Sequence, residues 1–240
     1  MLKYMIPCVA LAGSVIAASA IAGGTGVESK GSGMTQMEAD TTGATSRGFA
    51  IHSIESAPAQ TKEVLEWYNQ IFQFVPHLAG IMAESPALSR SYWQLQKNLQ
   101  ESGSLTQAEN NVVQMAVAVE NECQYCVAGH IMAGGMFFGA SPEEINALKT
   151  ASELPTPKLD ALRDFSLAVY ESKGRVSDAD LRRFYAAGYT RTQALDVVAN
   201  IASKIMSNYT NQIALTPMDE VLKPLAEGLP FEEDRKLVKD

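Results

Sequence analysis

The chain has 240 residues, of which 46% are hydrophobic, and carries a formal net charge of −8 at pH 7. This length allows one domain or at most two small ones, with enough apolar residues to build a buried core. The acidic balance argues against nucleic acid as a partner and against binding to an anionic membrane surface. Small molecules and other proteins remain as possible partners.

The first residues have the pattern of an export signal. Lys3 gives a positive start, residues 4–18 are largely apolar, and Ala18-Ser19-Ala20 has the small-x-small pattern of a cleavage site. The uncharged run up to Ala22 is also close to the length that crosses a bilayer, so an uncleaved anchor is the alternative. We therefore expect residues 1–20 to direct export, giving a periplasmic or secreted protein or, in the alternative, one anchored by its N-terminus.

Three further regions follow this signal. Residues 21–55 are rich in Gly, Ser and Thr and poor in large apolar residues, which predicts a flexible leader. Residues 56–225 have a helical pattern almost throughout, and residues 226–240 form a charged C-terminal tail.

Residues that typically start or end helices divide residues 56–225 into segments. A first apolar-periodic helix ends at Pro76, and a second begins at Pro86 and ends at Gly103. Thr106 and Glu109 form a capping box ahead of an Ala/Val-rich helix, and Ser141-Pro142 begins another. More helices are expected at 157–173, 177–187 and 191–213, with a short one near Pro217. Because no alternating strand pattern is present, the predicted fold class is all-α.

Cys123 and Cys126 are the cysteines that remain once Cys8 is assigned to the signal. A disulfide three residues apart closes almost no loop, so this CxxC pair is better explained by redox chemistry or metal binding than by stapling. Zinc would need a fourth ligand beyond these cysteines and His130, and His52 and His77 look isolated. We expect no metal and no cofactor.

The residues around the CxxC pair fall on one side of an expected helix. Without a proline between residues 112 and 138, Glu120, Cys123, Cys126 and His130 would lie within about a third of the circumference. Cys126 and His130 are i,i+4 neighbours, so the imidazole can act as a base for the thiol, directly or through a water. A thiolate attacks a peroxide to give a sulfenic acid, which a nearby thiol converts to a disulfide. We assign Cys126 as the peroxidatic cysteine and Cys123 as the resolving one, with Glu120 passing protons or orienting the network.

The segment Val119-Glu-Asn-Glu-Cys-Gln-Tyr-Cys-Val-Ala-Gly-His130 resembles the core motif of the alkylhydroperoxidase D-like branch of the carboxymuconolactone decarboxylase superfamily. The resemblance covers roughly residues 60–222. It implies an all-helical fold that associates into homo-oligomers, as trimers or hexamers. It also implies a peroxidase whose second cysteine attacks an organic hydroperoxide and whose disulfide is reduced by a dithiol donor, a lipoylated protein in the prototype.

Two features depart from that prototype. It carries a glutamate of its proton relay twelve residues before the first cysteine, and here that position is Asn111. An amide cannot transfer protons in the same way, and Glu120 is the candidate substitute. The second departure is the export signal, which separates the protein from a cytoplasmic lipoylated donor and leaves the electron donor open between a protein and a small thiol.

The expected function is a thiol peroxidase that reduces organic hydroperoxides through a dithiol/disulfide cycle. One alternative is a general thiol–disulfide oxidoreductase that uses the same two cysteines without preference for peroxide. The other is a non-catalytic helical oligomer that senses redox state or holds an inert disulfide. The decarboxylase branch of the superfamily lacks the CxxC pair, so the pair argues against that activity.

Overall fold

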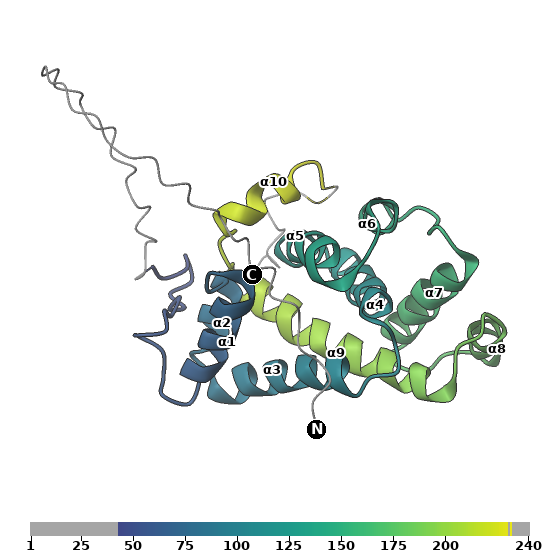
Figure 1. The fold of residues 1–240 in the computed structure, drawn as a ribbon, viewed down its shortest axis with the longest axis horizontal. Helices are drawn as coiled ribbons and strands as arrows, with labels where there is room; N and C mark the ends of the chain where they lie inside the picture. The colour runs from purple at the N-terminus through teal and green to yellow at the C-terminus, as the bar shows by residue number, and fades with distance from the viewer. Residues whose placement is uncertain (1–42, 230, 232–240) are drawn as a thin grey trace, which may run out of the picture. The chain divides into compact units, whose positions relative to one another are not determined.

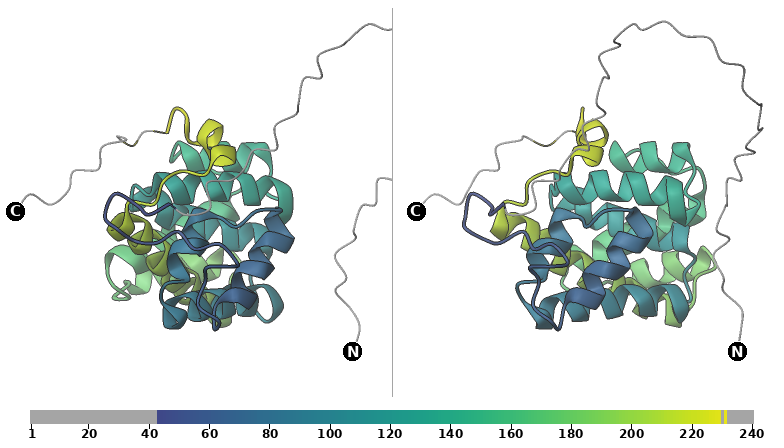
Figure 2. Two further views of the ribbon diagram at one scale, coloured as in Figure 1. Left: turned by 90° about the vertical axis from the view of Figure 1, so that its left-hand side faces the viewer. Right: turned by 60° about the vertical axis from the view of Figure 1, so that its left-hand side comes forward.

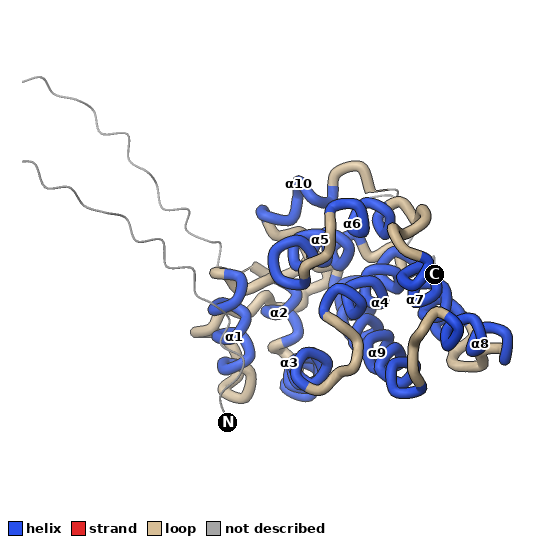
Figure 3. The backbone as a smooth tube through the Cα atoms, turned by 45° about the vertical axis from the view of Figure 1, so that its right-hand side comes forward, coloured by secondary structure: helices blue, strands red, loops and turns tan. Residues whose placement is uncertain are grey.

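A computed structural model describes residues 43–229 and 231, and in that part of the chain the regular structure is helical (Figures 1 and 3). The predicted all-α class is confirmed. The first 42 residues, which include the expected export signal and most of the expected leader, lie outside the described residues. No helix in the described part is long and apolar enough to cross a membrane.

The helices are α1 (Lys62–Phe72), α2 (His77–Met82), α3 (Pro86–Glu101), α4 (Gln107–Glu120), α5 (Gln124–Ala133), α6 (Pro142–Lys149), α7 (Pro157–Glu171), α8 (Asp178–Ala186), α9 (Arg191–Ala214) and α10 (Lys223–Ala226), with a π-helical turn η1 (Gly134–Phe138) and a 3₁₀ turn η2 (Glu220–Leu222).

The expected starts of α3, α4, α6, α7 and α9 are present near the expected residues, whereas the short helix expected near Pro217 begins only at Glu220, as η2. The hydroxyl groups of Thr106, Ser141 and Thr190 each accept a hydrogen bond from the backbone N–H three residues later, and the side chain at that position bonds back to the cap. Gly174 and Gly188, just past α7 and α8, have φ angles of +83° and +94°, a conformation that glycine adopts without steric cost. Local sequence therefore determines most helix boundaries.

Helix α4 lies at the centre of the domain and packs against α5, α6, α7 and α9. Val113, Met115 and Val117 of α4 are completely buried, so nearly every side of this helix faces other protein. The 24-residue helix α9 runs alongside α4 and also contacts α3 (Figure 1). Helices α4 and α9 together support the short helix α5, which carries the CxxC pair.

Residues 43–55 of the expected leader contact the helical domain. The His52 N–H donates to the Gly80 carbonyl of α2 at 3.3 Å, and the Ala50 N–H donates to the Glu84 carboxylate at 3.2 Å. Gly80 permits the close approach, because a Cβ there would lie 2.7 Å from the His52 carbonyl oxygen. Residues 43–55 run alongside α1 and α2 at one end of the domain (Figure 2).

At the other end of the chain, α10 packs against α5. Leu222, Ala226 and Leu229 are buried in the main hydrophobic cluster, together with Cys123 and Cys126. The described start of the expected C-terminal tail therefore contributes to the packing around the CxxC helix.

Candidate functional site

A tight turn between α4 and α5 positions the CxxC pair. Helix α4 ends at Glu120, and Glu122 then adopts a left-handed conformation with φ of +50°. The Cys123 N–H donates to the Ala118 carbonyl at 2.9 Å, and the Asn121 side-chain amide donates to the Val117 carbonyl at 3.0 Å. These bonds satisfy the last carbonyls of α4 and make Cys123 the N-cap residue of α5.

The sulfur atoms of Cys123 and Cys126 lie 2.6 Å apart, and both cysteines are free. Cys126 lies in the first turn of α5, where the positive end of the helix dipole favours a thiolate. Both side chains are buried, at 0% and 4% exposure respectively. A disulfide between them requires little movement of the backbone.

The pKa of Cys126 falls to about 6. Burial by itself raises the pKa, but the hydrogen bond from the Cys123 thiol and the nearby charge of Lys204 outweigh it. The Asn211 side-chain amide also donates to the Cys126 sulfur, at 3.1 Å, and an Asn208 hydrogen bond adds to the effect. Cys126 is therefore a thiolate at neutral pH.

Cys123 has the opposite character. Burial raises the pKa of its thiol well above the ordinary value, and the hydrogen bond that it donates to Cys126 raises it further. Cys123 therefore remains protonated while Cys126 is ionised, which gives the two cysteines different chemical roles.

His130 bridges two buried side chains. Its Nδ1 lies 2.8 Å from the Asn111 Oδ1, and its Nε2 lies 2.8 Å from the Lys204 Nζ. An ammonium can only donate, so Nε2 accepts from Lys204, and Nδ1 carries the proton that it donates to Asn111. Burial and the Lys204 charge both lower the pKa of His130 well below 6.5, which keeps the ring neutral.

The structure gives His130 a different neighbour from the one expected from sequence. No hydrogen bond joins His130 to Cys126 within the described residues, and the ring lone pair already accepts from Lys204. A direct role as base for Cys126 therefore has no support in this geometry. His130 instead fixes the direction of the Lys204 ammonium.

Lys204 is buried in α9 at 2% exposure. It forms no ion pair with a carboxylate of the described chain. A buried cation without a counter-ion is costly. Its charge instead stabilises the Cys126 thiolate, so each ion compensates the other in the low-dielectric interior.

A second polar cluster anchors the other side of α5. The Tyr125 hydroxyl donates to the Asp219 carboxylate and accepts from the Leu78 N–H at 3.2 Å. The same carboxylate accepts from the His77 N–H at 3.1 Å. Asp219 therefore connects the chain before η2 to the start of α2 and to Tyr125, one of the two residues between the cysteines.

Cys126, His130 and Lys204 line a cavity of about 150 Å³. Cys123 is not among the lining residues. The remaining walls are mostly aromatic and aliphatic side chains of α1, α2, α3 and η1. A small molecule that enters the cavity therefore meets Cys126.

The single helical face expected from the spacing does not extend to Glu120. Because the chain turns at residues 121–123, Glu120 belongs to the last turn of α4, whereas the cysteines and His130 belong to α5. Its side chain is exposed and forms no hydrogen bond with the CxxC pair within the described residues. The structure thus brings together Cys123, Cys126 and His130 and places Glu120 outside the cluster.

Lys204, Asn208 and Asn211 were not identified as site residues from the sequence. They lie on the buried face of α9, which also carries Asn200 and Ser207. A lysine at i, with asparagines at i+4 and i+7 on the same face of a long helix, is the signal that could have pointed to them. No cluster of His, Cys, Asp and Glu suited to a metal is present in the described residues.

Residues 86–163 match the model of the carboxymuconolactone decarboxylase family. This segment contains α3, α4 and α5 with the CxxC pair. This part of the chain is therefore similar to the carboxymuconolactone decarboxylase family. No curated protein matches the chain in sequence.

Solved structures of low sequence identity share the fold. A peroxidase-related protein with an alkylhydroperoxidase AhpD core from Ralstonia eutropha JMP134 superposes with a TM-score of 0.64 at 21% identity, over 73% of this chain and 94% of that one. A peroxidase-related protein from Silicibacter sp. TM1040 gives 0.62 at 17% identity, over 78% and 96%. The debrominase Bmp8 in complex with 2,3,4-tribromopyrrole gives 0.63 at 16% identity, over 79% and 96%. The names of the matching family and structures thus include several kinds of enzyme.

Proposed function

We propose that the protein is a thiol-dependent peroxidase that reduces organic hydroperoxides. The observation that carries the proposal is the asymmetry of the two cysteines: Cys126 has a pKa of about 6 and faces the cavity, whereas Cys123 is protonated and does not line it. A peroxidase needs this arrangement, because the thiolate must meet the substrate while a thiol waits beside it. The peroxidase-related names of two structural neighbours agree with this chemistry.

The reaction begins at the Cys126 sulfur. The thiolate attacks the terminal oxygen of the hydroperoxide, a sulfur–oxygen bond forms, and the oxygen–oxygen bond breaks to release an alkoxide. The Lys204 ammonium lines the same cavity, stabilises the alkoxide charge and supplies the proton that makes the alcohol. His130 holds the ammonium in place by accepting one of its N–H bonds.

Cys123 completes the cycle. Its sulfur, 2.6 Å from that of Cys126, attacks the sulfenic acid to form the disulfide, and the hydroxyl leaves with the Cys123 proton as water. A dithiol donor, a protein or a small thiol, then returns the two electrons and restores both thiols. The net reaction consumes one hydroperoxide and one dithiol and yields an alcohol, water and a disulfide.

The burial of the CxxC pair favours a peroxidase over a general thiol–disulfide oxidoreductase. A protein disulfide must reach the attacking sulfur, and Cys126 is only 4% exposed and lines a cavity of about 150 Å³. A small hydroperoxide fits such a space. The ionised Cys126 also argues against an inert disulfide, because a purely structural pair has no need of a lysine-stabilised thiolate.

The expected homo-oligomer has a candidate contact face on α9. Leu195, Val198, Tyr209 and Ile213 are between 45% and 71% exposed and follow one another at helical spacing on the outer side of this helix. Exposed apolar stripes of this kind mark interaction surfaces. Light scattering coupled to size-exclusion chromatography tests the assembly, and a monomer in solution would contradict it.

Turnover of cumene hydroperoxide with dithiothreitol tests the function. We expect the reduced protein to consume the peroxide, Cys126→Ser to abolish turnover, and Cys123→Ser to stop after one event with a trapped sulfenic acid on Cys126. If the protein consumed no peroxide but its cysteines exchanged readily with protein disulfides, the peroxidase proposal would be wrong. The general thiol–disulfide oxidoreductase would then be favoured.

A further inference from the structure

The cavity has one wall made of aromatic rings. Trp67, Tyr68 and Phe72 of α1 and Phe74 just after it all line the space. The rings of Tyr68 and Phe72 stack with centroids 6.2 Å apart, and Trp67 meets Tyr68 edge to face at 5.0 Å. Helix α1, which carries three of these residues, packs against α2 at one end of the domain (Figure 1).

Several of the polar side chains that line the cavity already have partners within the protein. The Gln96 side chain donates to the Tyr92 hydroxyl at 3.1 Å, and the Gln114 side-chain amide donates to Asn200 at 2.7 Å. Lys204 interacts with His130 and with the Cys126 thiolate. A sugar would leave most of its hydroxyl groups without partners here, at a considerable cost.

We infer that the hydroperoxide is an uncharged arylalkyl hydroperoxide whose body is a single aromatic ring. The inference rests on the proposed peroxidase function and specifies its substrate class. An apolar cavity of 150 Å³ in another protein holds benzene, so the volume here matches one ring. Rings also gain from edge-to-face and offset contacts with the aromatic wall beyond their buried area. The hydroperoxide group of the bound ring then reaches Cys126, which lines the same cavity.

The aromatic wall belongs to a part of the chain that the family model does not match. Helix α1 and Phe74 precede residue 86, where the match begins, whereas the reacting cysteines lie inside it. The segment that matches the family model thus supplies both cysteines, and the preceding helix α1 supplies part of the wall of the substrate site.

Binding of an unreactive ring tests the inference without any turnover. The chain has two tryptophans, Trp67 and Trp93, so in a Trp93→Phe variant the fluorescence reports on the cavity wall alone. We expect 2-phenyl-2-propanol to change this fluorescence saturably, and tert-butanol to bind at least ten-fold more weakly. Equal affinity for the two alcohols, or no saturable change, would overturn the inference.

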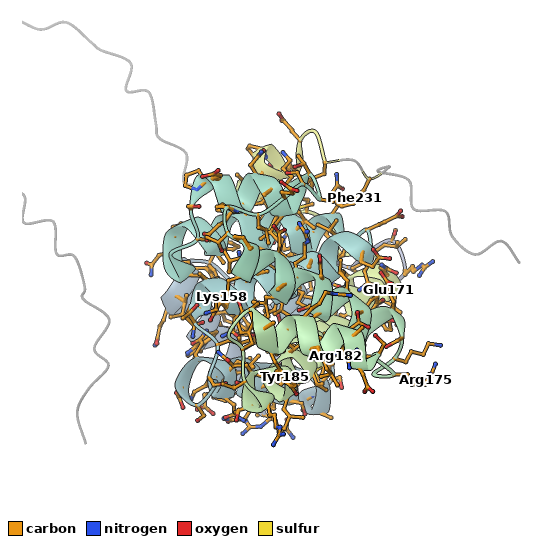
Figure 4. All side chains as sticks on the ribbon, turned by 90° about the vertical axis from the view of Figure 1, so that its right-hand side faces the viewer. Lys158, Glu171, Arg175, Arg182, Tyr185 and Phe231 are labelled. Carbon is orange, nitrogen blue, oxygen red and sulfur yellow. The ribbon has the colours of Figure 1, made fainter. Side chains whose placement is uncertain are left out.

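Kinetics separate the inference from the function on which it rests. We expect kcat/KM for cumene hydroperoxide to exceed that for tert-butyl hydroperoxide by at least ten-fold, and the ratio to shrink in Phe72→Ala and in the milder Phe72→Leu. The matched control Tyr185→Ala changes an exposed ring on α8, far along the chain and labelled in Figure 4, and should leave the ratio unchanged. Equal kcat/KM values for both peroxides would overturn the aromatic preference alone, whereas no consumption of either peroxide would overturn the peroxidase.

Discussion

The Nζ atom of Lys204 lies 2.8 Å from the Nε2 atom of His130, and both side chains line the cavity that Cys126 faces. The neutral imidazole accepts one N–H of the ammonium and thereby fixes where the positive charge sits. Sequence spacing alone suggested that His130 acts on Cys126 as a base. The contact instead makes Lys204 the group that stabilises the thiolate and His130 the group that positions it.

Replacing Lys204 removes that charge. In Lys204→Met we expect the pKa of Cys126 to rise from about 6 toward or above the ordinary value, because burial is then opposed only by hydrogen bonds. The rate of iodoacetamide alkylation at pH 7 should fall about ten-fold or more, since the thiolate fraction falls. The half-exposed Lys158, labelled in Figure 4, provides the control Lys158→Met, which should leave the alkylation profile unchanged. If the pH midpoint of Cys126 alkylation were unchanged in Lys204→Met, Lys204 would not stabilise the thiolate.

Asn211 stabilises the thiolate by a hydrogen bond rather than by charge. Its amide donates to the Cys126 sulfur at 3.1 Å, so Asn211→Leu should raise the pKa of Cys126, though by less than Lys204→Met does. A hydrogen bond to a charged group contributes about 1.5–3 kcal/mol, equivalent to a rise of about 1–2 in pKa. Alkylation rates measured between pH 5 and 9 give the shift directly, and a lower pKa in the variant would contradict the assignment.

Replacing each of two glycines near the site by alanine should change the free energy of unfolding in opposite directions. A Cβ on Gly134 would lie 2.8 Å from the Asn111 side-chain nitrogen, whereas a Cβ on Gly129 meets nothing within 4 Å. We expect Gly134→Ala to lower the free energy of unfolding by about 1–3 kcal/mol through overpacking, and Gly129→Ala to raise it by up to about 1 kcal/mol through helix propensity. Urea denaturation measures both, and a stabilised Gly134→Ala variant would show that Asn111 is free to move.

Glu120 provides a test of the proton-relay hypothesis. The exposed side chain lies outside the cluster of cysteines, His130 and Lys204, so Glu120→Gln should leave the peroxidase rate within about two-fold of the native rate at all pH values. A stopped-flow pH profile provides the measurement. A selective loss of activity in Glu120→Gln would restore Glu120 as a proton carrier.

Glu109 links stability to pH. Burial raises the pKa of its carboxyl group, but the Thr106 N–H and the Lys158 ammonium outweigh burial and hold the pKa below the ordinary 4.5. A depressed carboxyl pKa contributes stability that is present above about pH 4.5 and is lost as the pH falls through the folded-state value. The drop in Tm below that pH should be smaller in Glu109→Gln than in the native protein. Glu143→Gln, at an exposed position of α6, should retain the full drop.

Local signals were sufficient for most of the fold. Capping residues predicted where α4 and α6 begin, because a cap acts within one helical turn. The turn at Glu122 was missed, since neither proline nor glycine marks it and a non-glycine residue adopts the left-handed conformation there.

The candidate site could be predicted only in part. Cys123, Cys126 and His130 are close in sequence, and their motif shows their chemistry. Lys204 comes from α9, and the packing of α9 against α5 depends on tertiary contacts that local patterns do not contain. The aromatic wall from α1 depends on the same kind of long-range packing.

The central claim is that Cys126 reduces a hydroperoxide with electrons from the CxxC pair itself. We would mix fully reduced protein with one equivalent of cumene hydroperoxide, without any added thiol, and follow the alcohol by chromatography and the protein by mass spectrometry. We expect one equivalent of 2-phenyl-2-propanol to form and the peptide that carries Cys123 and Cys126 to lose two hydrogens. Unchanged peroxide alongside two free thiols would contradict the central claim.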